Sequence, residues 1–131
     1  MSDTATASSR TLVGTGLIAV AVAAAATTLV AAVGRSAGIT LVVGEAPIPL
    51  SGFALLTGIS STAGLLLSAV LNRTTAHPRG LFVRITVGLT GLSLIPDLVV
   101  QASGPTKVLL MLTHIVAATI VIPMIAGRLP A

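Results

Sequence analysis

The chain has 131 residues, of which 54% are hydrophobic and only 8% are charged, and its net charge is +4. A soluble domain of this size uses roughly 25% charged residues to cover its surface, so this composition favours an integral membrane protein. Cysteine is absent, which excludes disulfides and thiolate metal sites, and the scattered positive charges without interleaved aromatic residues argue against a nucleic-acid partner.

The N-terminal part holds one predicted span and a long connection. Residues 1–10 are small and polar and predict a disordered tail. Residues 11–33 carry no charge and are long enough to cross about 30 Å of hydrocarbon, so they predict the first transmembrane helix. A cleaved signal peptide is the alternative, because Arg10 precedes an alanine-rich run. Residues 34–49 form an apolar outer loop broken by Pro47 and Pro49, either a re-entrant cap or a short strand lying over the bundle.

Three further spans follow. Residues 50–71 predict the second helix, with a stripe of small residues at helical spacing, namely Thr57, Ser61, Gly64 and Ser68. A polar loop precedes the third helix, residues 81–103. The tight "GPTK" turn makes the fourth helix, residues 107–126, an antiparallel neighbour of the third. The sequence therefore predicts an all-α, four-helix transmembrane domain over residues 11–131.

The distribution of Lys and Arg predicts the orientation. With the N-terminus inside, most of them fall on the cytoplasmic side, namely Arg10, Arg73, Arg79, Arg84 and Arg128. The outer side then carries only Arg35 and Lys107. The positive-inside rule thus favours a multi-pass protein of the cell membrane with both termini in the cytoplasm.

The third span has a polar face. At about 100° per residue, its polar residues share an arc of about 80°, and they are Thr86, Thr90, Ser93, Asp97 and Gln101. Such a face is expected to point into the bundle. Pro96 frees the carbonyl of Leu92 and bends the helix next to Asp97, which either opens a cavity or only shapes the packing.

Asp97 and His114 are predicted to meet. At 1.5 Å per residue they lie about 9 Å and about 10 Å below the outer ends of the third and fourth spans, so an antiparallel hairpin brings them together. Met111 lies on the same helical face as His114. Glu45, in an apolar stretch of the outer loop, is either a lid over this site or simply solvated.

These residues favour an acid/base enzyme. A charged carboxylate in the bilayer costs about 2.5–3.5 kcal/mol, so Asp97 marks either a functional site or a hydrogen bond between helices. The catalytic candidates are Asp97, His114 and Glu45. The substrate-binding candidates are Thr90, Ser93, Gln101 and Met111.

The expected reaction uses proton transfer on a lipophilic small molecule. Epoxide opening, cyclisation or isomerisation of an isoprenoid- or polyketide-like substrate needs no more than this. With only two aromatic residues, a carbocation would be poorly stabilised, which favours a simple ring opening or closure. No cofactor is expected, and no metal, because the spacing of a helical zinc site is missing.

Two other function classes fit the same residues. A proton-coupled transporter subunit would use Asp97 and His114 as a relay and would have to form a homo-oligomer. A non-catalytic membrane module would bind a lipid or a partner helix through the small-residue stripe of the second span.

The alanine- and valine-rich spans and the closing pattern "KVLLMLTHIVAATIVIPMIAGRLP" give the whole chain a family likeness. It resembles the small four-helix membrane proteins of unknown function that are common in actinobacteria. The resemblance implies the architecture and no activity.

Overall fold

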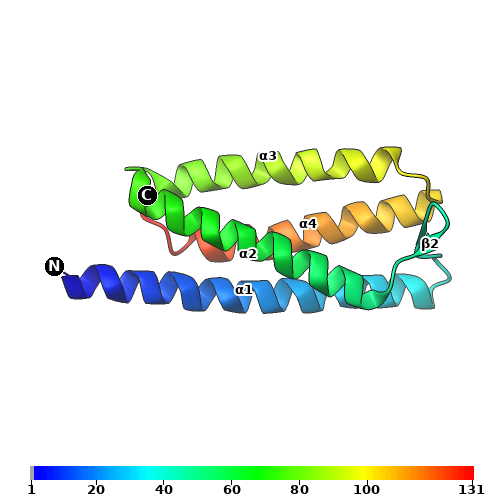
Figure 1. The fold of residues 1–131 in the computed structure, drawn as a ribbon, viewed down its shortest axis with the longest axis horizontal. Helices are drawn as coiled ribbons and strands as arrows, with labels where there is room; N and C mark the ends of the chain where they lie inside the picture. Colours follow the sequence, from blue (N-terminus) through cyan, green and yellow to red (C-terminus); the bar gives the residue numbers. More distant parts are fainter. Residues whose placement is uncertain (1) are drawn as a thin grey trace.

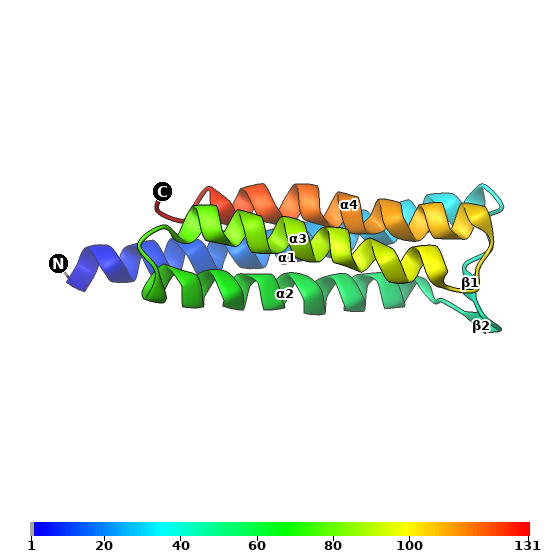
Figure 2. The ribbon, with the colours of Figure 1, turned by 90° about the horizontal axis from the view of Figure 1, so that it is seen from above.

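A computed structural model describes residues 2–131, and the side chains of residues 8–131, as a four-helix bundle (Figure 1). Its helices are α1 (Ser2–Ser36), α2 (Leu50–Thr74), α3 (Pro78–Val99) and α4 (Gly104–Ala126). All four are long and apolar enough to cross a membrane, which confirms the predicted all-α membrane bundle. Both chain termini lie toward one end, the terminal end (Figures 1 and 2). The α1–α2 and α3–α4 connections lie at the other, the hairpin end.

Several helix boundaries differ from the predicted ones. Helix α1 begins at Ser2, so residues 2–10, predicted to be disordered, are helical, and Met1 lies outside the described residues. Extending a nucleated helix by alanine and other small residues costs little free energy. Helices α3 and α4 begin earlier than predicted because Pro78 and Pro105 occupy their first turns, where a missing N–H is tolerated. Helix α3 ends at Val99, and Ser103 instead caps α4 by accepting a hydrogen bond from the Thr106 N–H.

Helix α1 packs against both α2 and α4 along much of its length. Apart from Leu12, its buried face is made of small residues, namely Gly16, Ala19, Ala23, Thr27, Ala31 and Gly34. A Cβ atom at Gly16 would overlap Leu65 of α2, and one at Gly34 would lie 2.9 Å from Leu109 of α4. Helix α1 is thus an integral, closely packed part of the four-helix bundle.

Buried apolar side chains form two clusters, and each contains one of the two phenylalanines. At the terminal end, Phe82 belongs to a cluster with Leu65, Leu71, Val121, Ile125 and Leu129. At the hairpin end, Phe53 belongs to a cluster with Ala31, Leu41 and Leu109. Many large apolar side chains on the outward faces are exposed, as contact with lipid requires.

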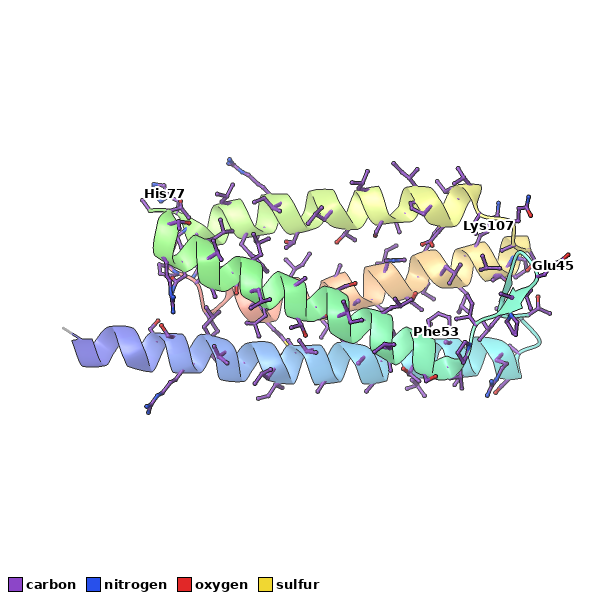
Figure 3. All side chains as sticks on the ribbon, in the orientation of Figure 1. Glu45, Phe53, His77 and Lys107 are labelled. Atoms are coloured by element: carbon purple, nitrogen blue, oxygen red, sulfur yellow. The ribbon has the colours of Figure 1, made fainter. Side chains whose placement is uncertain are left out.

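The connection between α1 and α2 contains a short antiparallel hairpin, β1 (Val42–Val43) and β2 (Ala46–Pro47). Gly44, at its turn, has a positive φ of 61°. The Gly44 N–H donates to the Gln101 carbonyl at 2.6 Å, and the Thr106 hydroxyl donates to the Thr40 carbonyl. This hairpin lies over the end of the bundle (Figure 3), so the strand alternative is confirmed and the loop does not re-enter the bundle.

The C-terminal segment is fixed at the terminal end. Nε of Arg79 donates to the carbonyls of Ala126 and Leu129, each at 3.0 Å. The Arg79 N–H donates to the Pro130 carbonyl at 3.2 Å, and Leu129 is buried. One arginine at the start of α3 therefore holds the chain that follows α4.

Candidate functional site

The side chains of Asp97 and His114 meet between α3 and α4. Nδ1 of His114 lies 2.8 Å from Oδ2 of Asp97, which confirms the predicted contact. The short connection from Val99 to Gly104 makes the two helices antiparallel and brings both residues to one depth. Their side chains differ in exposure, 11% for Asp97 and 40% for His114. The aspartate is thus the inner member of the pair, and the histidine is the accessible one.

Nδ1 of His114 has a second neighbour, the Leu110 carbonyl oxygen at 3.0 Å. A carbonyl oxygen can only accept, so Nδ1 carries the hydrogen, and Nε2 of a neutral ring carries the lone pair. Oδ2 of Asp97 is buried and receives no well-aligned hydrogen bond, despite its short distance to Nδ1. The contact between Asp97 and His114 is therefore mainly electrostatic in this arrangement.

His114 lies on the wall of a cavity of about 500 Å³. The cavity forms because α3 packs more extensively on α4 than on α2, and because small side chains leave the space between these three helices unfilled. Its lining residues come from α2 (Ser60, Ser61, Ala63, Gly64, Leu67), α3 (Phe82, Thr86, Leu89, Thr90, Ser93) and α4 (His114, Ala117, Ala118, Val121, Ile122).

The cavity opens sideways. All the lining residues of α4 are buried or half-buried, whereas Ser60 and Ala63 of α2 and Leu89 of α3 are exposed. The opening therefore lies between α2 and α3, on the flank of the bundle. In a bilayer this flank faces hydrocarbon, so a molecule dissolved in the membrane can enter without passing through water.

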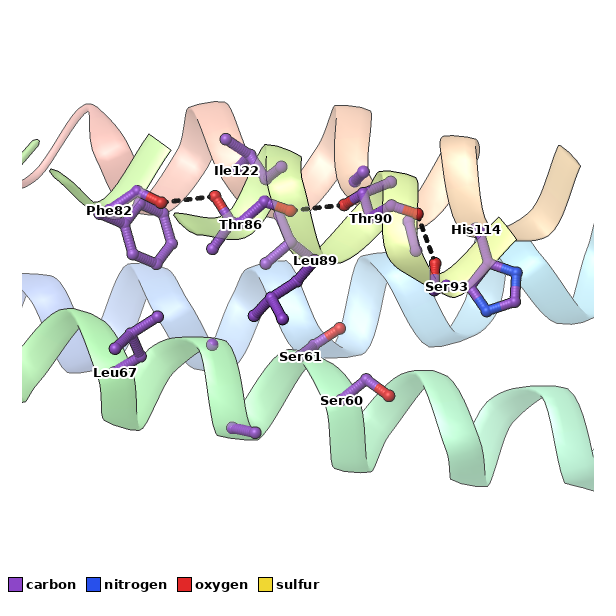
Figure 4. Close-up of a pocket in the computed structure, with 15 residues that line it drawn as sticks. Ser60, Ser61, Leu67, Phe82, Thr86, Leu89, Thr90, Ser93, His114 and Ile122 are labelled. Atoms are coloured by element: carbon purple, nitrogen blue, oxygen red, sulfur yellow. Dashed lines mark hydrogen bonds between the residues drawn. The ribbon is translucent and has the colours of Figure 1, made fainter. Parts of the chain in front are cut away.

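The two ends of the cavity differ in polarity (Figure 4). Toward the hairpin end lie Ser60, Ser93 and His114, and toward the terminal end lie Leu67, Phe82 and Ile122. Hydroxyl groups of α3 line the wall between these ends and donate to carbonyls of their own helix, at 2.7 Å for Thr86, 2.8 Å for Thr90 and 2.6 Å for Ser93. Their lone pairs remain free to accept hydrogen bonds from a bound molecule.

The sequence-predicted residues divide into two groups. Thr90, Ser93 and His114 lie on the cavity wall, and Asp97 reaches the cavity through His114. The structure does not bring Glu45, Gln101 or Met111 to this wall.

Each of these three residues is displaced for a physical reason. Glu45 is exposed at the turn of the β1–β2 hairpin, and its side chain points away from the bundle (Figure 3). Gln101 lies beyond the end of α3, so it does not belong to the polar face of that helix. Its backbone carbonyl oxygen instead accepts a hydrogen bond from the β1–β2 hairpin. Met111 is half-buried on α4 outside the cavity wall.

Several wall residues were not identified from the sequence. Ser60 of α2 and Ala117 and Ala118 of α4 line the cavity, and their small side chains leave much of it unfilled. The available signal was the run of small residues "SSTAG" in α2 opposite "VAAT" in α4. The predicted stripe of α2 serves two purposes, since Ser61 and Gly64 line the cavity and the Thr57 hydroxyl binds that of Thr27 at 2.9 Å.

Fold and site together define a multi-pass membrane protein, a four-helix bundle with an Asp–His pair beside a cavity open to lipid. The chain belongs to the family of unknown function DUF6069, which matches residues 7–131. No curated protein and no solved structure shows a significant match to it. The family spans all four helices, in agreement with the expected likeness to proteins of unknown function.

Proposed function

We propose that this protein is a cofactor-independent acid/base enzyme that acts on a lipophilic small molecule taken from the membrane. The observation that supports the proposal is the position of the Asp97–His114 pair at the polar end of a largely apolar cavity. Cavities of this size, with a few polar groups in an apolar wall, suit small ligands. Ionisable side chains within a membrane span are costly and are generally functional.

In the proposed mechanism, His114 transfers the proton and Asp97 acts through it. Nε2 of His114 accepts a proton from a hydroxyl or an acidic C–H group of the substrate. The imidazolium that forms is stabilised by the Asp97 carboxylate, which lies 2.8 Å from Nδ1. Nε2 then returns the proton to another substrate atom.

This proton cycle accounts for three reactions. In an epoxide opening, the deprotonated hydroxyl oxygen forms a bond to an epoxide carbon, the C–O bond of the epoxide breaks, and the epoxide oxygen receives the proton from Nε2. Isomerisation and cyclisation of an isoprenoid- or polyketide-like substrate use the same transfer. Phe82 is the one aromatic side chain on the described wall, so the cavity suits ring opening or closure without a long-lived carbocation.

The proposal includes an orientation in the cell membrane. The excess of Lys and Arg at the terminal end favours cytoplasmic termini. The polar end of the cavity then lies in the outer half of the bilayer, beneath the β1–β2 hairpin.

Turnover by matched histidine variants tests this function. The protein in lipid nanodiscs is incubated with a panel of isoprenoid and polyketide epoxides that carry a free hydroxyl, including 10,11-epoxyfarnesol, and the products are separated by chromatography and mass spectrometry. We expect His114→Gln to lower kcat by about 10²- to 10⁴-fold, the usual contribution of a general acid/base. His77→Gln, at the exposed residue that precedes α3, should leave kcat unchanged.

Other outcomes favour the other function classes. Equal turnover by wild type and His114→Gln would rule out His114 as the base. Binding of panel members without conversion would favour a non-catalytic lipid-binding module. Proton flux across liposomes that depends on His114 would favour a transporter subunit acting as a homo-oligomer.

A further inference from the structure

We infer that the cavity binds a neutral single-chain amphiphile of the isoprenoid alcohol class, and that Gly64 limits the length of the chain that fits. The polar end of this molecule lies at His114, and its hydrocarbon chain runs toward Phe82. The inference rests on the proposed function, because it names the substrate class of the same site.

The shape of the cavity favours a chain. Ser93 and Phe82 line opposite ends of its α3 wall, and at 1.5 Å per helical residue they are about 16 Å apart along the axis. A volume of about 500 Å³ spread over that length is long and narrow. A single hydrocarbon chain fills such a space better than a compact fused-ring molecule does.

The chemistry of the wall favours a neutral polar group. Ser60 and Ser61 line the cavity, and their hydroxyls make no hydrogen bond to any other side chain or backbone group that the structure describes. Because Nδ1 of His114 is held by Asp97 and Leu110, Nε2 is the ring nitrogen left for a bound molecule. Together these groups can accept a hydrogen bond from a hydroxyl, and they can donate one to a hydroxyl, a ketone or an epoxide. The lining residues include no Lys or Arg, so nothing on the wall matches a phosphate or diphosphate.

The opening matches the orientation of such a molecule in the bilayer. The cavity runs along the helices, with its polar end toward the hairpin end of the bundle (Figure 4). An amphiphile of the adjacent leaflet already has its polar group near that surface and its chain toward the membrane centre. It can therefore enter between α2 and α3 without turning over.

Gly64 is the position that controls the available length. It lies on the cavity wall, between Ser60 and Ser61 at the polar side and Leu67 at the apolar side. A Cβ atom built at Gly64 meets no atom within 4 Å, so a side chain there would extend into cavity space. A Cβ atom at Gly58 of the same helix is equally unobstructed, but Gly58 lines a neighbouring groove, with Ala54, Leu55 and Thr62, and does not line this cavity. The two glycines are a matched pair for substitution.

Binding of prenols of increasing length tests the inference. The probes are geraniol, farnesol and geranylgeraniol, each one isoprene unit longer than the last, in competition with a diazirine-bearing farnesol analogue that photolabels the protein in nanodiscs. We expect wild type to be labelled on the facing walls of α2 and α3. Gly64→Leu should weaken farnesol binding at least about tenfold, because an isoprene unit loses its apolar contacts, while geraniol binding is kept.

Gly58→Leu should leave all three affinities unchanged. Equal loss in both leucine variants, no loss in Gly64→Leu, or labelling confined to the outward helix faces would overturn the inference. Gly64→Ala should give the same shift on a smaller scale, so the test holds even if the leucine variant does not fold.

The outcomes separate this inference from the enzyme proposal. Prenol binding that depends on Gly64, without conversion of any epoxide, leaves the inference intact and contradicts the enzyme. If epoxide conversion requires His114, but its preference for chain length is unchanged by substitution of Gly64, the result supports the enzyme proposal and contradicts the inference.

Discussion

At the scale of single residues, the most unusual atom is Oδ2 of Asp97. It is buried, lies 2.8 Å from His114 and receives no well-aligned hydrogen bond. A buried acceptor left in this state costs about 1–3 kcal/mol. That cost is offset when a positive charge develops on the neighbouring imidazole, which is what the proposed proton transfer does.

Asp97→Asn and His114→Gln should act as one unit. Asp97→Asn removes the charge that stabilises the imidazolium, so we expect kcat to fall by at least about 10-fold, the lower end of the loss seen when a carboxylate that orients a metal-bound histidine is removed. The double variant should be no slower than His114→Gln alone, since members of one catalytic unit are not additive. Steady-state kinetics of the four proteins measure this.

Independent, multiplying losses would contradict the coupling. If Asp97→Asn changed thermal stability but not kcat, the pair would be only a polar contact between α3 and α4.

The sequence predicted this pair but not the whole site. The contact of Asp97 with His114 follows from helix rise and a short connection, which are fixed quantities. The positions of Glu45 and Gln101 depend on the hairpin and on where α3 ends, which residue periodicity does not determine. The cavity arises from small residues that three helices place opposite one another, so no single helix reveals it.

At the scale of the helices, α1 depends on close approach. Small residues on its buried face let α2 and α4 pack near its backbone. Such packing, rather than the hydrophobic effect, holds helices together in a membrane. The stability of the bundle should therefore respond more to added volume on this face than to lost polar groups elsewhere.

Substitution of two neighbouring glycines of α1 tests this dependence. A side chain at Gly16 would overlap Leu65, whereas Gly14 has no atom near its Cβ position. We expect Gly16→Val to lower the free energy of unfolding by about 1–3 kcal/mol, the usual cost of overpacking. Gly14→Val should have little effect. Thermal unfolding in detergent followed by circular dichroism measures both, and equal effects would contradict close packing at Gly16.

The C-terminal segment should depend on the hydrogen bonds that the Arg79 side chain donates to it. Lysine has no counterpart of Nε, so Arg79→Lys should lose the hydrogen bonds to the Ala126 and Leu129 carbonyls and cost about 1 kcal/mol. Faster amide exchange over residues 127–131 would report the release of the C-terminal segment. Arg84→Lys, at an exposed position of the same helix, is the control. Unchanged exchange in Arg79→Lys would show that the buried Leu129 side chain and the backbone hydrogen bond to the Pro130 carbonyl are enough to hold the segment.

At the scale of the whole molecule, the sequence determines the membrane architecture directly. Long apolar spans with few charges and exposed apolar flanks are imposed by the hydrocarbon itself, so both the helix count and the fold class were predictable. The ends of the spans were less predictable, because the proline-led first turns of α3 and α4 extend beyond the most apolar residues.

The absence of cysteine makes the orientation directly testable. We expect Glu45→Cys, in the β1–β2 hairpin, to react with a membrane-impermeant maleimide on intact cells. Ala76→Cys, in the connection between α2 and α3, should react only after the membrane is permeabilised if the bundle has the orientation that the positive-inside rule favours. The reverse pattern of labelling would show that the bundle has the opposite orientation in the membrane.

The loose packing of α3 on α2 has a consequence for biogenesis. Helix α3 has the lowest hydropathy of the four spans and carries the buried Asp97. Its main partner is α4, which follows it in the chain and is synthesised later. During synthesis α3 should therefore insert weakly into the membrane until α4 is made. The two helices should then leave the translocon together as a helical hairpin. Truncation before α4 should leave α3 poorly inserted and open to quality-control proteolysis.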